Sequence, residues 1–355
     1  MKLIRVLVVE DSITIRKYLV DVLSSSGQFE VVGEAEDGKQ AMELCQLLRP
    51  DVVTMDMILP NITGVGATEY IMAYCPTPIL VVSASFNRGE IFRTYDALAA
   101  GAVDVLDKPK GNEPQEQWET KFLAAVRMVS RIKVITHPRG RLQSPALPEI
   151  PFGNKTLGDV RLIAIGASTG GPAAVARILG ALPAGFAIPI LIVIHISEQF
   201  AFALAEWLNT QSSVPVRYAR DNEDIPMLGT PTVLLAPAGK HLVIERQKVR
   251  LTDGPERHSC RPSVDTLFDS VARELGSSSA VFLLTGMGRD GASGLLNAKR
   301  AGSMTVAQDE ASSVVFGMPA EGIKLGAAQR ILSLDQIAET IRAFAPQPIA
   351  PRRSK

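Results

Sequence analysis

Cysteine is scarce in this sequence, and no two cysteines lie close together along the chain. The three cysteines, Cys45, Cys75 and Cys260, are scattered over 355 residues and form no C-x-x-C motif. An odd, scattered set argues against a disulfide framework and against a structural zinc site. It is consistent with a protein of a reducing compartment.

Net charge is lacking too, because 37 Lys and Arg residues balance 37 Asp and Glu residues. The whole chain therefore gives no electrostatic reason to expect nucleic acid or an anionic membrane as a partner. No apolar run approaches the roughly 20 residues that span a bilayer, and the first residues lack a signal-peptide cleavage pattern. We expect a cytoplasmic protein without direct membrane insertion.

The composition, 46% hydrophobic and 21% charged, is that of a globular protein, and 355 residues favour two domains. Residues 1 to about 109 alternate β-rich runs with helical patterns, which predicts a parallel, doubly wound sheet. The expected strands span residues 4–9, 29–34, 52–56, 79–83 and 103–107.

A second α/β region follows an expected helix over 114–135 and a linker with prolines at 138, 145, 148 and 151. Its expected strands span residues 162–166, 189–196, 232–236 and 280–285, and residues 240–254 suggest an antiparallel hairpin. The fold class is thus α/β with two doubly wound, mainly parallel sheets. The expected divisions are a first domain (1–125), a helix end with linker (126–158), a second domain (159–345) and a disordered tail (346–355).

Polar residues follow the expected strands of the first domain at one edge of its sheet, where open parallel sheets bind ligands. They are Glu10, Asp11, Asp56, Ser83 and Lys108. Clustered carboxylates favour a hard divalent cation such as Mg²⁺. Carboxylates, a hydroxyl and a lysine together are what phosphoryl transfer to Asp56 requires. Taken singly, each of these residues could equally cap a helix or end a strand.

The blocks "VLVVEDS", "DVVTMDMILPNITG", "VVSAS" and "VDVLDKP" resemble the receiver domain of two-component response regulators. The resemblance implies a flavodoxin-like fold, Asp56 as phospho-acceptor and a Mg²⁺ site at Glu10, Asp11 and Asp56. It also implies that Ser83 and Lys108 complete the switch, and that a histidine kinase is the phosphodonor. Val105 differs from the family, which commonly has an aromatic residue there.

The segment "RLIAIGASTGG" runs from an apolar strand into a glycine-rich turn around Ser168. A nucleophile, a phosphate cradle and a helix cap all fit such a turn. His195 and Asp290 follow two other expected strands, and parallel neighbouring strands would bring all three side chains to one edge. A hydroxyl, an imidazole and a carboxylate form a charge-oriented nucleophile, with His195 as base and Asp290 fixing its tautomer.

Other assignments remain open at this point. His137, His241 and His258 compete for the role of base, and of these His258 is the serious rival. The turn "GASTGG" could hold a pyrophosphate, but it does not follow the G-x-G-x-x-G pattern.

The blocks "IGASTGGP", "LLAPAGKHL", "RPSVDTLF", "LLTGMGRDGASG" and "AQDEASSVVFGMP" resemble the catalytic domain of the chemotaxis receptor methylesterase family (CheB). The resemblance implies a Rossmann-like three-layer domain with Ser168 as nucleophile, His195 as base and Asp290 as its orienter. Thr169 and Met287 would supply oxyanion donors. Ile196-Ser197 differs from the Met-Pro that usually follows the base in this family.

The two resemblances together imply a phosphorylation-activated esterase that converts glutamate γ-methyl esters on methyl-accepting chemoreceptors to glutamate and methanol. They also imply deamidation of receptor glutamines, with Mg²⁺ for phosphorylation and no cofactor for ester hydrolysis. In this view the unphosphorylated receiver blocks access until Asp56 is phosphorylated. We expect a monomer. The alternative is a response regulator whose second domain is a non-catalytic adaptor.

Overall fold

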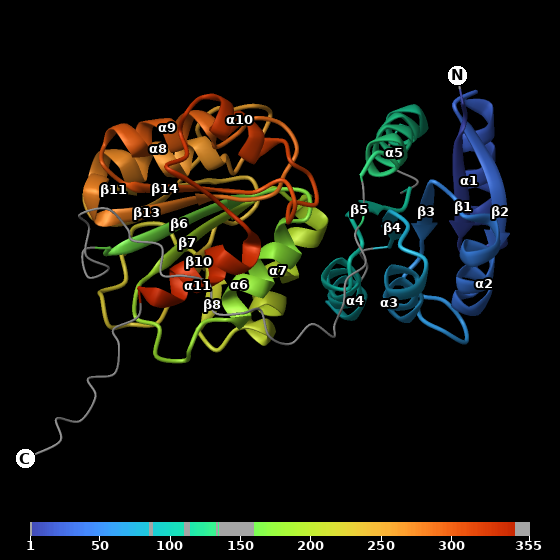
Figure 1. Cartoon of the computed structure of the whole chain (residues 1–355), viewed down its shortest axis with the longest axis horizontal. Helices are drawn as coiled ribbons and strands as arrows, with labels where there is room; N and C mark the ends of the chain where they lie inside the picture. Colours follow the sequence, from blue (N-terminus) through green and yellow to red (C-terminus); the bar gives the residue numbers. More distant parts are fainter. Residues whose placement is uncertain (1, 85–87, 110–113, 133, 135–159, 345–355) are drawn as a thin grey trace, which may run out of the picture. The chain divides into compact units, whose positions relative to one another are not determined.

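The structure is a computed structural model that describes residues 2–84, 88–109, 114–132, 134 and 160–344. The chain divides into two compact units, Met1–Leu147 and Pro148–Lys355, and each is described by itself. Both units are α/β with parallel central sheets, as the sequence predicts (Figure 1). The four linker prolines, His137 and the expected tail at 346–355 lie outside the described residues.

The first unit contains a five-stranded sheet whose neighbouring strands all pair in parallel. Its strands, in the order β2-β1-β3-β4-β5, are β1 (Ile4–Val9), β2 (Phe29–Ala35), β3 (Val52–Met55), β4 (Ile79–Ser83) and β5 (Asp104–Asp107). Its helices are α1 (Ile13–Ser25), α2 (Gly38–Leu48), α3 (Gly64–Tyr74), α4 (Arg88–Ala99) and α5 (Gln115–Val129). Helices α1 and α5 contact each other, and α3 contacts both α2 and α4. The strand order reverses between β1 and β3, which is where ligands bind in such sheets.

Helix α5 is shorter than the 114–135 helix that the sequence predicts. Its apolar face buries Trp118, Phe122, Val126 and Val129 at helical spacing, so the predicted face is correct. The helix ends at Val129, and Ser130 satisfies two of the last carbonyls. Tighter turn hydrogen bonds then replace the helical ones.

The second unit contains a seven-stranded sheet in which every pair is parallel. Its strands, in the order β15-β14-β13-β6-β7-β10-β8, are β6 (Leu162–Ala167), β7 (Ile190–Ile194), β8 (Val216–Tyr218), β10 (Val233–Leu235), β13 (Ser279–Leu283), β14 (Met304–Gln308) and β15 (Arg330–Leu332). The expected strands β6, β7 and β13 are adjacent. The sequence analysis did not predict β8, β14 or β15.

Helices cover both faces of this sheet, with α8, α9 and α10 on one face and α6, α7 and α11 on the other (Figure 1). They are α6 (Gly171–Gly180), α7 (Glu198–Gln211), α8 (Val264–Glu274), α9 (Ala292–Arg300), α10 (Met318–Lys324) and α11 (Leu334–Ala343), with a 3₁₀ turn at Gly276–Ser278. This is the three-layer arrangement that the sequence implied.

The predicted hairpin is present as an antiparallel pair. Strand β11 (His241–Glu245) pairs with β12 (Lys248–Thr252), which also pairs with the short β9 (Glu223–Asp224). Arg246 and Gln247 connect β11 and β12 with φ of 51° and 61°. Two consecutive positive φ values define the type I′ turn that matches the twist of a two-residue hairpin.

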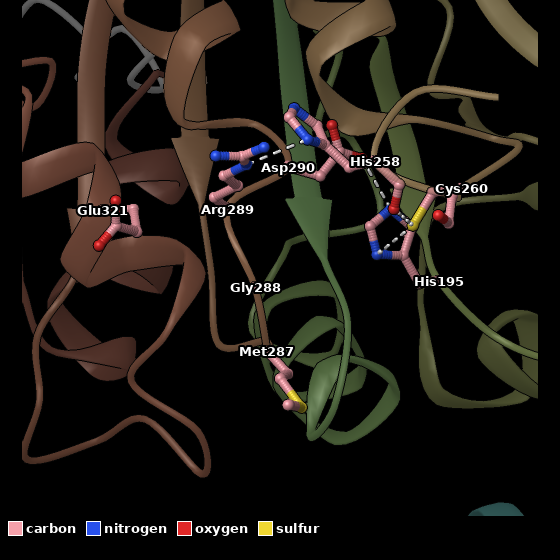
Figure 2. Close-up of a pocket in the computed structure, with 9 residues that line it drawn as sticks. His195, His258, Cys260, Met287, Gly288, Arg289, Asp290 and Glu321 are labelled. Carbon is pink, nitrogen blue, oxygen red and sulfur yellow. Dashed lines mark hydrogen bonds and ion pairs between the residues drawn. The ribbon is translucent and has the colours of Figure 1, made fainter. Parts of the chain in front are cut away.

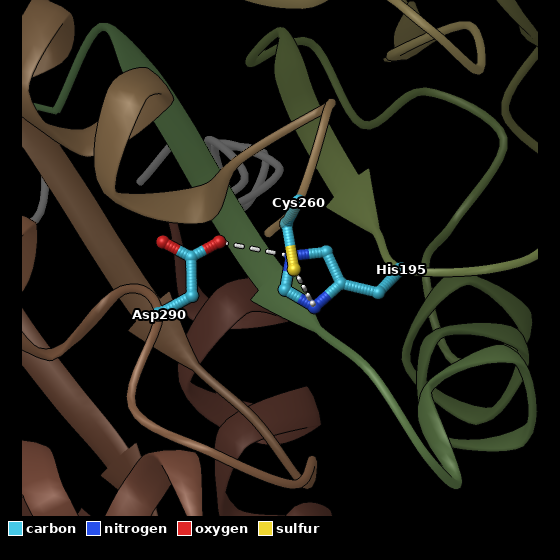
Figure 3. A group of neighbouring side chains, drawn as sticks. All are labelled: His195, Cys260 and Asp290. Carbon is cyan, nitrogen blue, oxygen red and sulfur yellow. Dashed lines mark hydrogen bonds and ion pairs between the residues drawn. The ribbon is translucent and has the colours of Figure 1, made fainter. Parts of the chain in front are cut away.

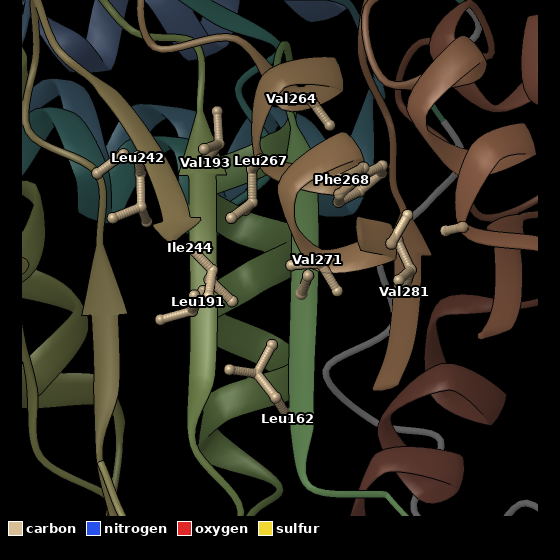
Figure 4. Close-up of a cluster of buried hydrophobic side chains, with 14 of the residues drawn as sticks. Leu162, Leu191, Val193, Leu242, Ile244, Val264, Leu267, Phe268, Val271 and Val281 are labelled. Carbon is tan, nitrogen blue, oxygen red and sulfur yellow. The ribbon is translucent and has the colours of Figure 1, made fainter. Parts of the chain in front are cut away.

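Helix α8 fixes the part of the core that supports the site. Val264, Leu267, Phe268 and Val271 are fully buried and spaced i, i+3, i+4, i+7. Figure 4 shows them above strands β6 and β7, against residues such as Leu191. Burying each such side chain contributes about 1.5–3 kcal/mol. This packing holds the first turn of α8 beside the carboxyl ends of the strands.

In the described part of the chain, no helix is both long and apolar enough to cross a membrane.

Candidate active site

The sheet of the second unit has a point where the chain changes direction. From β6 the chain passes to β7 on one side, and it later returns to β13 on the other. Ser168 follows β6, His195 follows β7 and Asp290 lies beyond β13. All three therefore lie beyond the carboxyl ends of strands at the switch point, where open α/β sheets bind ligands.

The turn that carries Ser168 is tightly enclosed. The Ser168 amide donates to the carbonyl of Thr285 at 3.0 Å, and the side chain is partly buried. Gly170 has φ of +76°, and a Cβ there would lie 2.6 Å from Val314 Cβ. Only glycine meets both conditions at this position. The glycine of the motif therefore serves the sharp turn that precedes α6.

Asp290 is held by the first turn of α8. Its Oδ1 accepts hydrogen bonds from Ser263 Oγ and from the Asp265 amide, both at 2.9 Å. Its Oδ2 accepts from the Val264 amide at 2.7 Å. An anion at a helix N-terminus is stabilised by the free amides and by the helix dipole. Although burial opposes the charge, these bonds together with His195 lower the pKa of Asp290, so the carboxylate stays ionised.

His195 is fixed by that carboxylate. Its Nε2 lies 2.9 Å from Asp290 Oδ2, and its side chain is 15% exposed. Burial lowers the pKa of His195, but hydrogen bonds with Asp290 and Cys260 more than offset it, and the pKa rises from 6.5 to about 9. The structure thus brings together the predicted base and its orienting acid, with Nδ1 left as the ring nitrogen that could accept a proton.

The neighbour of Nδ1 is Cys260, which the sequence analysis did not single out. Cys260 Sγ lies 3.8 Å from His195 Nδ1, and the dashed lines in Figure 3 join one ring nitrogen to the thiol and the other to the carboxylate. Within the described residues, no hydrogen bond joins the Ser168 hydroxyl to His195. A cysteine 65 positions away in the sequence offers no local pattern that could predict this contact.

A cavity of about 540 Å³ opens beside this group. Its lining includes His195, His258, Cys260, Met287, Arg289 and Glu321 (Figure 2). Met287, a predicted oxyanion donor, is therefore at the cavity, whereas Ser168 is not among its described lining residues. Thr169, the other predicted donor, accepts from Thr285 Oγ1 through its carbonyl.

The two remaining described histidines differ in their surroundings. His241 is buried, its Nδ1 accepts from the Ser263 amide, and its Nε2 contacts the Pro255 carbonyl. Both ring nitrogens are thus engaged in packing α8 against the hairpin. His258 lies in the cavity wall and contacts Asp265 Oδ2 at 3.0 Å. His258 therefore has a carboxylate partner of its own, which the sequence did not predict.

In the first unit, the predicted acids and lysine meet at the edge of the sheet. Lys108 Nζ lies 2.8 Å from Glu10 Oε2 and 2.9 Å from Asp56 Oδ2. Oxygen atoms of Glu10, Asp11 and Asp56 lie within 4.8 Å of one another. Ser83 ends β4 and is buried, and the amide of Lys108 donates to its carbonyl at 3.0 Å.

The electrostatics of this cluster suit a cation. Burial and the nearby Asp56 charge raise the pKa of Glu10 to about 7, and burial also raises the pKa of Asp56. Burial lowers the pKa of Lys108, but the two carboxylates raise it overall. Two buried carboxylates that repel each other form an oxygen-rich donor set of the kind that hard divalent ions prefer.

A carboxylate–lysine cluster at the edge of one parallel sheet and a His–Asp pair at a strand-end cavity of the other fit the class in which a receiver domain is joined to an α/β hydrolase domain. Comparison with known proteins agrees with this class. The sequence model of the CheB methylesterase family matches residues 163–341, and that of the response regulator receiver domain matches residues 6–116. The chain belongs to the CheB methylesterase family.

Individual relatives span almost the whole chain. A protein-glutamate methylesterase/protein-glutamine glutaminase of Nitrosospira multiformis is 41% identical over 345 residues, 96% of each chain. A protein of the same name, numbered 2, from Anaeromyxobacter dehalogenans is 42% identical over 340 residues, again 96% of each.

A solved structure is similar to part of the chain. The crystal structure of the Thermotoga maritima CheB methylesterase catalytic domain is 33% identical, with a TM-score of 0.49, and covers 52% of this chain and 99% of that one.

Proposed function

We propose that this protein is a protein-glutamate methylesterase activated by phosphorylation of its own receiver unit. It hydrolyses glutamate γ-methyl esters of methyl-accepting chemoreceptors to glutamate and methanol, and it deamidates receptor glutamines. The observation that carries the proposal is the pairing of His195 with a helix-anchored Asp290 at 2.9 Å, beyond the strand that follows the Ser168 turn. The alternative of a non-catalytic adaptor gives no reason for such a pair.

The proposed chemistry assigns one role to each side chain. Ser168 Oγ attacks the ester carbonyl and gives its proton to His195 Nδ1. Throughout, His195 Nε2–H keeps its hydrogen bond to the Asp290 carboxylate. The tetrahedral intermediate collapses to an acyl-enzyme as methoxide leaves with that proton as methanol. Water, deprotonated by His195, then releases glutamate and restores Ser168. With a glutamine substrate, ammonia leaves in place of methanol.

Backbone amides near Thr169 and Met287 are the proposed donors to the oxyanion. Met287 lies at the cavity and is 61% exposed, so its backbone can meet an incoming receptor side chain. Each such donor would contribute about 3–4 kcal/mol to stabilising the transition state. This hydrolysis needs no cofactor.

Regulation in this proposal acts through Asp56. Glu10, Asp11 and Asp56 would hold Mg²⁺, which would offset charge on the transferred phosphoryl oxygens. Lys108, already 2.9 Å from Asp56, would contact the phosphoryl group, and Ser83 would follow it. The donor would be a histidine kinase in the cytoplasm. A single chain carries both units, so the proposal needs no second copy and we expect a monomer.

Methanol release from methylated receptor membranes, with and without a small phosphodonor and Mg²⁺, tests the regulation. We expect the wild-type rate to rise with the phosphodonor and the Asp56→Asn rate to stay at the basal level. Asp51→Asn is a matched control, because Asp51 precedes the same strand and its Oδ2 accepts from the Arg5 amide instead. An equal rise in Asp56→Asn and wild type would contradict phosphorylation at Asp56.

A further inference from the structure

Cys260 and His195 form a pair of metal-ligand atoms that the proposed hydrolysis does not use. Ligand atoms of His195, Cys260 and Asp290 all lie within 4.8 Å of one another. We propose that Cys260 Sγ and His195 Nδ1 bind a zinc-class divalent cation, and that the bound ion inhibits the enzyme by occupying its base. Metal binding of this kind does not depend on the methylesterase activity.

The spacing of the two atoms suits zinc. Zinc binds thiolate at about 2.3 Å and imidazole nitrogen at about 2.0–2.1 Å, so a near-tetrahedral ion holds its S and N ligands about 3.5–3.8 Å apart. Cys260 Sγ and His195 Nδ1 are 3.8 Å apart without an ion. The site therefore needs little rearrangement to close on the metal.

Asp290 prepares His195 for this role. A metal-binding histidine usually donates its other ring N–H to a carboxylate, which fixes the ring and makes the ligating nitrogen more basic. Here Nε2 lies 2.9 Å from Asp290 Oδ2, and the other ring nitrogen, Nδ1, contacts the thiol (Figure 3). The Asp290 oxygens also accept three hydrogen bonds from the first turn of α8, so the carboxylate orients the ligand instead of binding the ion.

A tight turn holds the thiol in place. Arg257 and Cys260 exchange two backbone hydrogen bonds at 3.0 and 3.2 Å. His258 and Ser259, between them, have φ of 54° and 58°. Consecutive positive φ values close the chain into one defined turn. Cys260 is partly exposed at the cavity, so water can fill the remaining coordination positions.

The neighbouring group of His258, Asp265 and Asp290 fits a metal less well. Asp265 is fully buried and already accepts from the Gly294 amide at 2.6 Å. It also pairs with Arg257 at 3.3 Å, and that guanidinium would repel a second cation. The thiol–imidazole pair, whose Cys260 is partly exposed and forms no ion pair within the described part of the chain, is the favoured site.

Binding replaces protons with the metal. The S–H bond of Cys260 breaks and its proton passes to buffer. Below about pH 9, where His195 is protonated, the Nδ1–H bond also breaks and that second proton passes to buffer. Sulfur and Nδ1 then each donate a pair of electrons to the ion. No oxidation state changes. With its lone pair engaged, Nδ1 cannot accept the serine proton, and ester hydrolysis stops.

Titration of the metal-free full-length chain tests the site. Cd²⁺ serves as the probe because its thiolate complexes absorb in the ultraviolet, and Zn²⁺ binding is followed by calorimetry. In wild type we expect a thiolate–cadmium band that saturates at one thiolate-bound ion per chain, separate from any ion at the carboxylates of the first unit. Cys260→Ala should lose the band and bind Zn²⁺ at least tenfold more weakly. Cys45→Ala, which removes a thiol buried in the other unit, and His258→Gln should bind as wild type does.

Equal Zn²⁺ affinity in Cys260→Ala and wild type, or a Cd²⁺ complex without the thiolate band, would overturn the site. Alkylation gives a second measurement that needs no variant. Zn²⁺ should slow the reaction of iodoacetamide with Cys260 in wild type, as read by peptide mass spectrometry, and unchanged labelling would count against the site. Methanol release that continues with the ion bound would overturn the inhibition alone.

Discussion

Asp290 lies 2.9 Å from His195 through Oδ2 while the same carboxylate caps helix α8. The orientation of the proposed base is thus tied to the packing of a helix whose apolar face forms part of the core. A substitution in the first turn of α8 should therefore lower the catalytic rate, although the substituted residue does not contact the substrate.

Ser263→Ala tests that link. Ser263 caps α8 and donates to Asp290 Oδ1 at 2.9 Å. Losing a helix cap costs about 1 kcal/mol, and a less constrained Asp290 should lower kcat of methanol release by about tenfold, a barrier increase of about 1.4 kcal/mol. Ser333→Ala is the matched control, because Ser333 caps α11 in a capping box away from the site. It should lower stability by a similar amount and leave kcat unchanged. Equal kcat losses in both variants would show that the effect is only one of stability.

The pKa of His195, raised to about 9, predicts the pH dependence. Protonated His195 cannot accept the serine proton, so the rate should rise with pH and level off above about pH 9. The folded state keeps this proton to a higher pH than the unfolded chain, whose ordinary value is 6.5. The stability that the pair contributes is therefore complete below pH 6.5 and lost as pH rises through 9.

The measurement is kcat of methanol release against pH, with a chelator present to remove adventitious metal. The charged and titratable neighbours of His195 are Asp290 and Cys260. Asp290→Asn removes the charge that raises the pKa, and it should shift the remaining profile toward lower pH. A wild-type rate that is already maximal at pH 7 would contradict the raised pKa of His195.

Gly170→Ala tests the turn beneath Ser168. The left-handed φ and the 2.6 Å approach to Val314 Cβ should together reduce the free energy of unfolding by about 2 kcal/mol or more. Methanol release should fall as the turn shifts. Gly185→Ala is the control, because a Cβ there meets nothing within 4 Å and its φ is not positive. Thermal unfolding of the two variants should separate them clearly.

Lys108→Ala tests the charge balance of the receiver site. Lys108 is 12% exposed and lies between Glu10 and Asp56. Removing one partner of a buried ion pair costs about 3–5 kcal/mol, and Mg²⁺ should restore part of that loss by replacing the cation. Lys39→Ala is the control, since its exposed pair with Glu43 at 3.9 Å is worth well under about 1 kcal/mol. Denaturant unfolding in EDTA measures the loss in free energy of unfolding, and the same experiment in Mg²⁺ measures how much of that loss is restored.

The strands that position the predicted site could be found from the sequence because they are long apolar runs rich in β-branched residues. The analysis thus placed β6, β7 and β13, and the side chains that follow them, within one or a few residues of their observed ends. It missed β14, which contains Thr305 and Gln308. Gln308 Oε1 accepts from the Thr285 amide at 2.8 Å, a long-range pairing that lets a polar residue lie in the core.

Side-chain partners that depend on tertiary packing could not be predicted. The 257–260 turn brings Cys260 to His195 across 65 positions of sequence. Asp290 receives its hydrogen bonds from the first turn of α8 only once that helix is docked. The sequence predicted the acid and the base, but not the thiol beside them. It also gave no sign that His258 has its own carboxylate in Asp265.

Methanol release from methylated receptor by Ser168→Ala tests the central claim most directly. Ser197→Ala is the matched control, since Ser197 is exposed, begins α7 just after His195, and makes no side-chain capping bond. The proposed mechanism predicts that Ser168→Ala loses at least about 10³-fold in rate, whereas Ser197→Ala stays near wild type. A Ser168→Ala enzyme that folds and releases methanol at the wild-type rate would contradict it.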